Sequence, residues 1–306
     1  MESKTKAYVA LGMVCLVWGT TYLAVRIGVA GFPALLFMSV RNLIAGTLLL
    51  TVLAVLRKEK TWSWDNIKLQ IIPGLCMITF GIGIVGWSVK YIPSGLAALI
   101  CSMIPIFTMI VNLLFNKAER INWQIATGIM LGMCGVLLVF RDNLAFISNT
   151  NSLLGILVTM VSCLFWALGG LYTQKFKSGS GPFFNAGVQM LAGGLGLLVL
   201  SGLSEDWRQL PVPTTSSLFA LLYLIVFGSI LAFCSYLYAM SRLPAGLVSI
   251  YAYINPLVAI VLGYIILNEK ITWLTMLSFI ITMSGVYMVN VGYKLKKAQA
   301  LRLATD

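Results

Sequence analysis

The sequence predicts an all-α integral membrane protein in which ten transmembrane helices form two inverted five-helix repeats. Three observations predict this fold class. Of the 306 residues, 59% are hydrophobic and only 10% are charged, which leaves too little polar surface for a water-soluble globule of this size. The apolar residues fall into ten runs, each close to the ~20 residues that a helix needs to cross the hydrocarbon core. The second half of the chain also repeats the first.

Short polar joints separate the ten predicted spans. The spans cover residues 7–28, 33–55, 69–89, 94–115, 121–140, 152–173, 183–203, 215–239, 246–267 and 273–293. An even number of spans returns the chain to its starting side, and most lysines and arginines fall in the joints and tails on that side. The positive-inside tendency therefore predicts cytoplasmic N- and C-termini. Because the basic residues are dispersed over short joints, the net charge of +12 indicates membrane orientation and no nucleic-acid partner.

The internal repeat is clearest where YIPSGLAAL, starting at Tyr91, matches RLPAGLVSI, starting at Arg242. Further equivalent pairs are Trp18 with Trp166, Arg41 with Gln189, Pro105 with Pro256, Glu119 with Glu269 and Gly135 with Gly285. The predicted repeats cover residues 1–145 and 146–306, the second with a short cytoplasmic tail. Each repeat has an odd number of spans, so the second must enter the membrane with opposite polarity. Inverted repeats of this kind are characteristic of secondary transporters, which bind substrate near the midplane between the repeats.

The duplicated openings, the mid-span prolines, the Glu turns and the VWGTTY stretch starting at Val17 together resemble the EamA-type branch of the drug/metabolite transporter superfamily. The resemblance covers essentially the whole chain. It implies that spans 1 to 4 and 6 to 9 line a central cavity, and that spans 5 and 10 lie outside, where they could support a homodimer. It also implies efflux of small metabolites, amino acids or drug-like compounds across a bacterial inner membrane.

Polar and aromatic side chains inside the spans are the candidates for substrate contact. Arg41 is the only charged residue well inside a span, and an ionisable group at that depth marks a functional site by default. Its planar fork of donors could hold a substrate carboxylate or phosphate. The alternative is a structural arginine that bonds to carbonyls or reaches the outer interface. The candidate substrate contacts are Trp18, Thr21, Tyr22, Arg41, Trp166, Gln189, Tyr253 and Asn255.

Other residues in the repeat carry weaker expectations. Trp18 and Trp166 lie too deep for interfacial belt residues, so they face a cavity or pack between helices. Pro105 and Pro256 each free a backbone carbonyl near mid-span, which makes them candidate hinges, with a static kink as the alternative. Glycines in spans 5 and 7 indicate close helix packing. The turn residues Glu119 and Glu269 are expected to be solvated or to cap a helix.

The sequence also lacks the residues that several kinds of chemistry need. It has no histidine, and none of its aspartates or glutamates lies inside a span, so a buried proton-relay group is missing. This predicts a facilitator, an exchanger, or coupling through the charge of the substrate. No catalytic or metal-binding constellation is evident, and no cofactor is expected. A membrane-embedded enzyme is therefore disfavoured, while a passive channel remains the alternative to a carrier. The six cysteines lie in apolar runs and are interpreted as packing residues.

Overall fold

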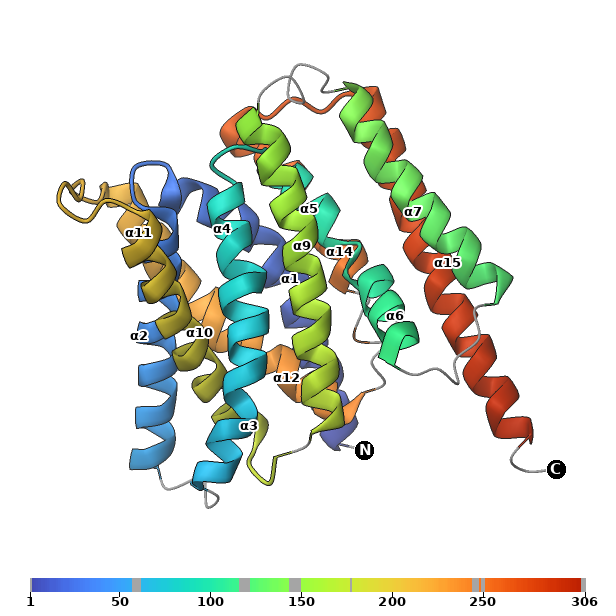
Figure 1. Cartoon of the computed structure of the whole chain (residues 1–306), viewed down its shortest axis with the longest axis horizontal. Coiled ribbons are helices and arrows are strands. Elements are labelled where there is room, and N and C mark those ends of the chain that lie inside the picture. The colour runs from blue at the N-terminus through green and yellow to red at the C-terminus, as the bar shows by residue number, and fades with distance from the viewer. Residues whose placement is uncertain are drawn as a thin grey trace.

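The computed structural model describes residues 2–56, 62–115, 122–142, 150–176, 178–243, 248 and 251–303, and this part of the chain is helical without strands. The described helices fall into ten successive groups along the chain, which we call passes, and Figure 1 shows their arrangement. The first five passes are α1 (Glu2–Val29), α2 (Ala34–Val55), α3–η1–α4 (Trp64–Gly74, Leu75–Gly83, Ile84–Ser88), α5–α6 (Ser94–Cys101, Ile104–Phe115) and α7 (Trp123–Asp142). The second five are α9 (Thr150–Lys175), α10 (Pro182–Ser204), α11–η2–α12 (Thr215–Tyr223, Leu224–Leu231, Ala232–Arg242), α14 (Tyr251–Leu267) and α15 (Trp273–Leu303).

The helices have the length and composition of membrane spans. Six of them are long and apolar enough to cross a bilayer, and three shorter apolar helices cover Ser94–Thr108, Ile254–Leu267 and Trp273–Val289. The start of α1 and the end of α15 lie at the same end of the bundle, at the bottom of Figure 1. We call this end the N-terminal face and the other end the opposite face. The predicted all-α, multi-pass membrane fold is confirmed.

Counterpart helices of the two halves pack on one another with opposite polarity: in Figure 1, α1 runs away from the N-terminal face and α9 runs toward it. Helix α1 packs against α14 and α12, while its counterpart α9 packs against α6 and η1. Helix α2 packs against its counterpart α10, and α7 packs against its counterpart α15. These pairings are those that an axis in the membrane plane produces between inverted repeats.

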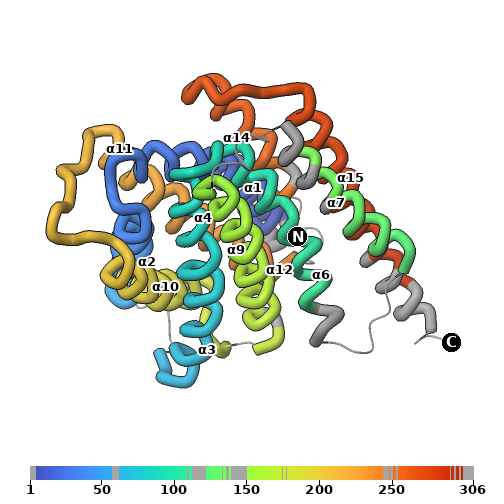
Figure 2. The backbone as a smooth tube through the Cα atoms, turned by 45° about the horizontal axis from the view of Figure 1, so that its top comes forward, coloured from blue at the N-terminus to red at the C-terminus, as the bar shows by residue number. Residues whose placement is uncertain are grey.

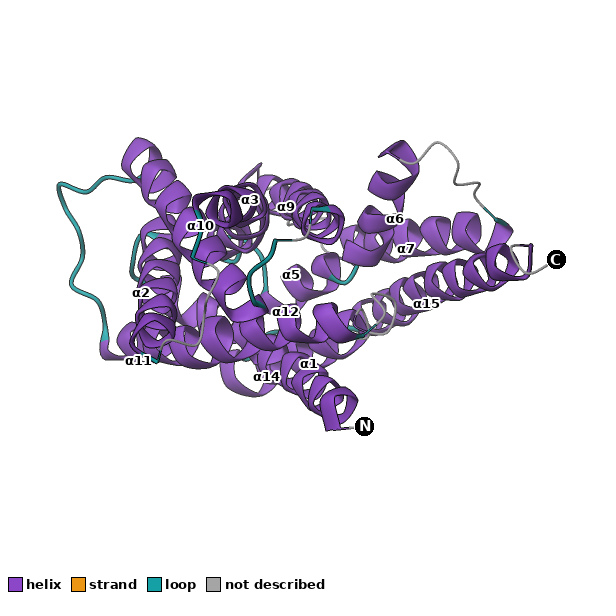
Figure 3. Cartoon of the chain, turned by 90° about the horizontal axis from the view of Figure 1, so that it is seen from below, coloured by secondary structure: helices purple, strands orange, loops and turns teal. Residues whose placement is uncertain are grey.

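Glycines bring α7 and α15 into close contact. A Cβ atom added to Gly285 would lie 2.4 Å from the backbone nitrogen of Gly132 and 2.6 Å from the carbonyl oxygen of Gly128. A side chain at Gly285 would therefore push the two helices apart, as expected for small residues at a membrane helix seam. The α7–α15 pair stands to one side of the other helices in both the tilted view (Figure 2) and the view from the N-terminal face (Figure 3).

Three passes depart from regular helix. The fourth pass is interrupted at Ser102 and Met103, and Pro105 is the second residue of the helix that follows. The third and eighth passes each contain a wider π-helical segment, η1 and η2, and Gly81 inside η1 leaves helical geometry altogether (φ −83°, ψ −106°). No interruption occurs at Pro256, because α14 runs through it from Tyr251 to Leu267. A proline removes only one intrahelical hydrogen bond, and the helix continues past that loss.

Candidate functional site

A cavity of about 80 Å³ lies between the two halves of the chain. Its walls come from α1, α2, η1, α4, α5, α6, α9, η2, α12 and α14. Among the described residues, α7 and α15 contribute nothing to it, as the resemblance implied for spans 5 and 10. Of the predicted substrate contacts, the cavity wall contains Trp18, Thr21, Tyr22, Arg41, Trp166 and Asn255. We call this space the central cavity.

Two predicted contacts are not placed in the central cavity. Gln189 is fully buried, and its amide nitrogen donates to Oε1 of Gln70 at 2.6 Å. It lies in the seam between α10 and α3, where a Cβ on Gly74 would lie 2.9 Å from the Gln189 Cα. Equivalence to Arg41 in the repeat therefore does not bring Gln189 to the cavity. The side chain of Tyr253 lies outside the described residues.

An aromatic layer lies at the end of the central cavity nearest the N-terminal face. It consists of Trp18, Trp166, Phe233, Tyr236 and Tyr251. The Trp18 ring lies 5.5 Å from that of Trp166, 5.1 Å from that of Tyr236 and 5.3 Å from that of Tyr251, measured between centroids. Contacts at these distances stabilise aromatic clusters beyond the area they bury. Trp18 also donates its indole N–H to the carbonyl oxygen of Gly228 at 3.3 Å.

A second, larger cavity of about 430 Å³ lies on the other side of this layer. Its wall combines Tyr236 and Met77 with residues from the ends of α9, α10 and α12 at the N-terminal face, including Thr173, Asn185 and Ser241. Tyr236 borders the second cavity, whereas Trp18 and Trp166 border the central one. The aromatic layer therefore separates the central cavity from the N-terminal face.

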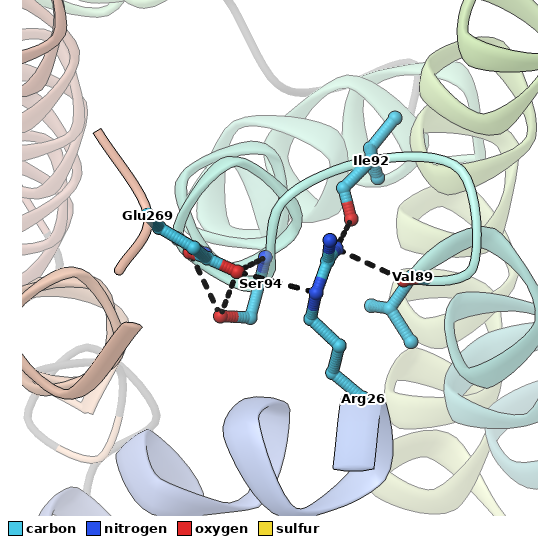
Figure 4. A network of polar contacts seen from close by, with 6 residues as sticks. Arg26, Val89, Ile92, Ser94 and Glu269 are labelled. Carbon is cyan, nitrogen blue, oxygen red and sulfur yellow. Dashed lines mark hydrogen bonds and ion pairs between the residues drawn. The ribbon is translucent and has the colours of Figure 1, made fainter. Parts of the chain in front are cut away.

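At the opposite face, a polar network joins the two halves of the chain (Figure 4). Arg26, at the end of α1, forms an ion pair with Glu269, with 3.4 Å between Nε and Oε1. Nη1 of Arg26 also donates to the carbonyl oxygens of Val89, at 3.1 Å, and Ile92. Glu269 in turn accepts from the backbone N–H of Ser94 at 3.0 Å. We call these contacts the opposite-face network.

The chain places the Glu269 carboxylate through its own backbone. Asn268, just beyond α14, has a positive φ of 53°, a conformation that asparagine tolerates at helix ends. The N–H of Glu269 then donates to the carbonyl oxygen of Gly263 at 3.1 Å. Gly263 leaves room for the carboxylate, since an added Cβ would lie 2.4 Å from Oε2 of Glu269. The expected capping role is confirmed for Glu269, which caps α5 from the other half of the chain; Glu119 lies outside the described residues.

A second carboxylate at this face makes a similar link. Glu205, after α10, accepts from the backbone N–H groups of Leu35 and Leu36 at 2.9 Å each. Both groups belong to the first turn of α2, where unpaired N–H donors and the helix dipole favour an anion. Two acids from the second half thus hold two helix N-termini of the first half.

Arg41 reaches into the central cavity from α2. Its side chain is only 4% exposed, and its Nε donates to the hydroxyl of Ser229 at 2.8 Å. Ser229 lies in η2, and the neighbouring Gly228 leaves space for the guanidinium, because an added Cβ would lie 2.9 Å from Nη2. The irregular segment of the eighth pass therefore shapes the surroundings of the only charged residue in the described cavity wall.

Sequence reasoning missed several members of the site. Phe233 and Tyr236 complete the aromatic layer, and their signal was an aromatic residue within a predicted span. Ser229 and Gly228 offered no signal, because a small residue in an apolar run is ordinary helix packing. The link between Glu269 and Arg26 could not be found from spacing, since it joins residues at opposite ends of the chain.

The sequence model of the EamA-like transporter family matches this chain twice, over residues 5–141 and 153–291. The chain belongs to the EamA-like transporter family. It is 30% identical over 285 residues to a protein of Escherichia coli named "Uncharacterized inner membrane transporter YedA", covering 92% of this chain and 90% of that protein. It is 25% identical to the Bacillus subtilis transporter YoaV, with coverage of 95% and 99%.

Two further similarities extend this result. A "Probable amino-acid metabolite efflux pump" of Escherichia coli is 22% identical over 94% of this chain and 95% of its own length. A solved crystal structure superposes with a TM-score of 0.66 over 94% of this EamA-like chain and 98% of the other, at 16% sequence identity. The structural likeness shows the shared fold, and the family match shows a membrane transporter family.

Proposed function

We propose that this EamA-like protein is a secondary transporter that exports small organic metabolites by alternating access. One observation carries the proposal: the central cavity lies between the inverted halves, with the aromatic layer at one end and the opposite-face network near the other. A carrier needs a site between two barriers that open in turn. In this arrangement the N-terminal face is cytoplasmic and the membrane is the bacterial inner membrane.

In this proposal the opposite-face network closes the outer side of the carrier. The larger cavity at the N-terminal face is the route by which substrate reaches the aromatic layer from the cytoplasm. Passage to the outside requires that Arg26 separate from Glu269 and that Glu269 release the N-terminus of α5. The passes around the cavity can bend at three places: the helix interruption before Pro105 and the irregular segments η1 and η2. Pro256 remains a candidate hinge within a continuous helix.

The relatives support the direction and the class of cargo. One is named an inner membrane transporter and another an amino-acid metabolite efflux pump. The partners in this proposal are a small-molecule substrate and the lipid bilayer. A homodimer through α7 and α15 remains a prediction, since the face of this pair that points away from the other helices is available to a second copy.

Counterflow tests this proposal against a passive channel. Liposomes containing the purified protein are loaded with an unlabelled amino acid or organic acid and diluted into trace labelled compound. A carrier gives transient accumulation of label above equilibrium, because the unlabelled substrate returns the loaded site to the outside. A channel gives simple equilibration. Protein-free liposomes are the control, and equilibration without an overshoot for every transported compound would remove alternating access.

A further inference from the structure

We propose that Arg41, held by Ser229, binds a single carboxylate of the substrate, and that the rest of the cavity takes an apolar body. The transported compounds would then be small organic acids that carry a single carboxylate. This inference rests on the proposed transport function and names its substrate class.

The guanidinium of Arg41 is positioned but not neutralised. Its Nε is taken by the neutral hydroxyl of Ser229, and Nη1 has only a long contact of 4.0 Å to the sulfur of Met38. No carboxylate within the described chain forms an ion pair with it. A buried charge without a counter-ion is strongly unfavourable, and a bound anion would relieve that.

The orientation of the side chain suits a carboxylate. An arginine can present two parallel N–H groups to the two oxygens of one carboxylate. With Nε held by Ser229, the remaining pair of nitrogens is Nη1 and Nη2. Gly228 leaves space beside Nη2, where any side chain would crowd it. Met38 is a weak acceptor, so an incoming carboxylate oxygen readily replaces its sulfur.

The charge of the cavity wall favours a carboxylate ligand over a phosphate dianion or an amine cation. Among the described wall residues Arg41 is the only charge, and there is no aspartate or glutamate. One carboxylate therefore neutralises the site. A phosphate dianion would leave an uncompensated negative charge, and an amine cation would be repelled by Arg41 with no acid to receive it.

The remaining wall selects the body of the ligand. On the same side of the aromatic layer as Arg41 it carries aliphatic side chains, including Val25, Ile82, Val85 and Val89. Two hydroxyls of the wall are already engaged: those of Thr21 and Ser162 donate to the carbonyl oxygens of Trp18 and Thr159, each at 2.7 Å. The aliphatic part of the wall fits an apolar body.

Matched ligands test this inference without any transport step. Each of two sets shares a hydrocarbon body and differs in carrying a carboxylate, both a carboxylate and an amine, or an amine alone: 4-methylpentanoate, leucine and isoamylamine, and 3-phenylpropionate, phenylalanine and phenethylamine. Binding to the detergent-solubilised protein is followed by equilibrium dialysis and by thermal stabilisation. We expect at least one acid to bind about 100-fold more tightly than its amine, because the buried charge pair is formed only with the acid. An amine that binds as well as its acid in both sets would overturn the proposal, as would no binding by any of the acids.

Variants then assign the binding to Arg41. Arg41→Gln is expected to lose about 100-fold in acid affinity, and Arg41→Lys, which keeps the charge without the fork, about 10-fold. Ser229→Ala keeps the arginine and is expected to lose a few-fold, which covers the event that Arg41→Gln does not fold. The matched control is Gln189→Met, at the equivalent position of the repeat, buried and outside the cavity. Equal acid affinity in Arg41→Lys, Ser229→Ala and the control would refute the assignment.

The experiments can refute alternating access and the Arg41 carboxylate site independently of each other. Loss of counterflow with intact, Arg41-dependent acid binding would remove alternating access and leave the carboxylate site. Counterflow of a compound whose binding is indifferent to Arg41→Lys and Ser229→Ala would leave the carrier and remove the carboxylate site.

Discussion

In the proposed carrier, the contact between Arg26 and Glu269 breaks when the opposite face opens. Their side chains are 31% and 13% exposed, so the ion pair contributes on the order of 1 kcal/mol, as surface and half-buried pairs do. A glutamine at position 269 can still accept from the N–H of Ser94, but it cannot pair with the guanidinium. Glu269→Gln should therefore shift the population of the outward-open state by about fivefold without unfolding α5.

Cys101 reports this shift, because its thiol borders the central cavity. In a variant with Cys101 as its only cysteine, Glu269→Gln should speed modification by a membrane-impermeant maleimide added at the opposite face. Asp206→Asn removes another acid from that face; its carboxylate bonds only the nearby N–H of Arg208 among the described contacts, so the labelling rate should not change. An unchanged rate in Glu269→Gln would show that the opposite-face network is not a barrier.

The predicted contacts that line the central cavity share one property: each is conspicuous in an apolar span. Arg41, Trp18 and Asn255 stand out from a lipid-facing pattern for that reason, and the structure brings them to one cavity. Gln189 stands out equally, yet its amide nitrogen donates to Gln70 in a helix seam. A polar residue in a span predicts burial against protein, and only the packed structure decides between a cavity and a seam.

Among the elements, the α7–α15 pair has a structural role that can be tested apart from transport. Gly285→Ala would place a Cβ against backbone atoms of Gly128 and Gly132, and backbone cannot move aside as a side chain can. We expect a loss of about 1–3 kcal/mol in stability from this overpacking. Thermal unfolding in detergent measures it. Gly12→Ala in α1 is the matched control, since nothing lies within 4 Å of its added Cβ, and it should be neutral or slightly stabilising. Equal stability of the two variants would contradict the close contact.

The order of elements was predictable because each pass is a long apolar run, but their internal breaks were not. Proline is the usual mark of a break, and Pro105 does follow one, whereas α14 continues through Pro256. The π-helical segments η1 and η2 contain no proline. Helix α9 packs on η1 and α2 packs on η2, and such tertiary contacts are not recorded in a local sequence pattern.

For the whole molecule, the inverted fold predicts which loops face which compartment. Single cysteines at Arg208, between α10 and α11, and at Asp65, at the start of α3, lie at opposite ends of the bundle. The lysine and arginine distribution predicts that intact cells expose position 208 to an impermeant reagent and shield position 65 until the membrane is permeabilised. The reverse labelling pattern would invert the proposed orientation, and with it the direction assigned to the two cavities.

The distribution of acids over the whole chain also predicts how export is driven. All aspartates and glutamates lie outside the interiors of the spans and the chain has no histidine, so no buried side chain is available to carry a proton with the substrate. A carboxylate substrate would then move its own charge across the membrane. An inside-negative potential of 100 mV is worth about 2.3 kcal/mol for one charge, which favours efflux of an anion about 50-fold at equilibrium.

In liposomes with a valinomycin-clamped potassium gradient, efflux of a transported acid should follow the sign of the potential and ignore a pH gradient, while a zwitterion should respond to neither. Acid efflux driven by the pH gradient alone would show that protons are coupled through a group that this account omits.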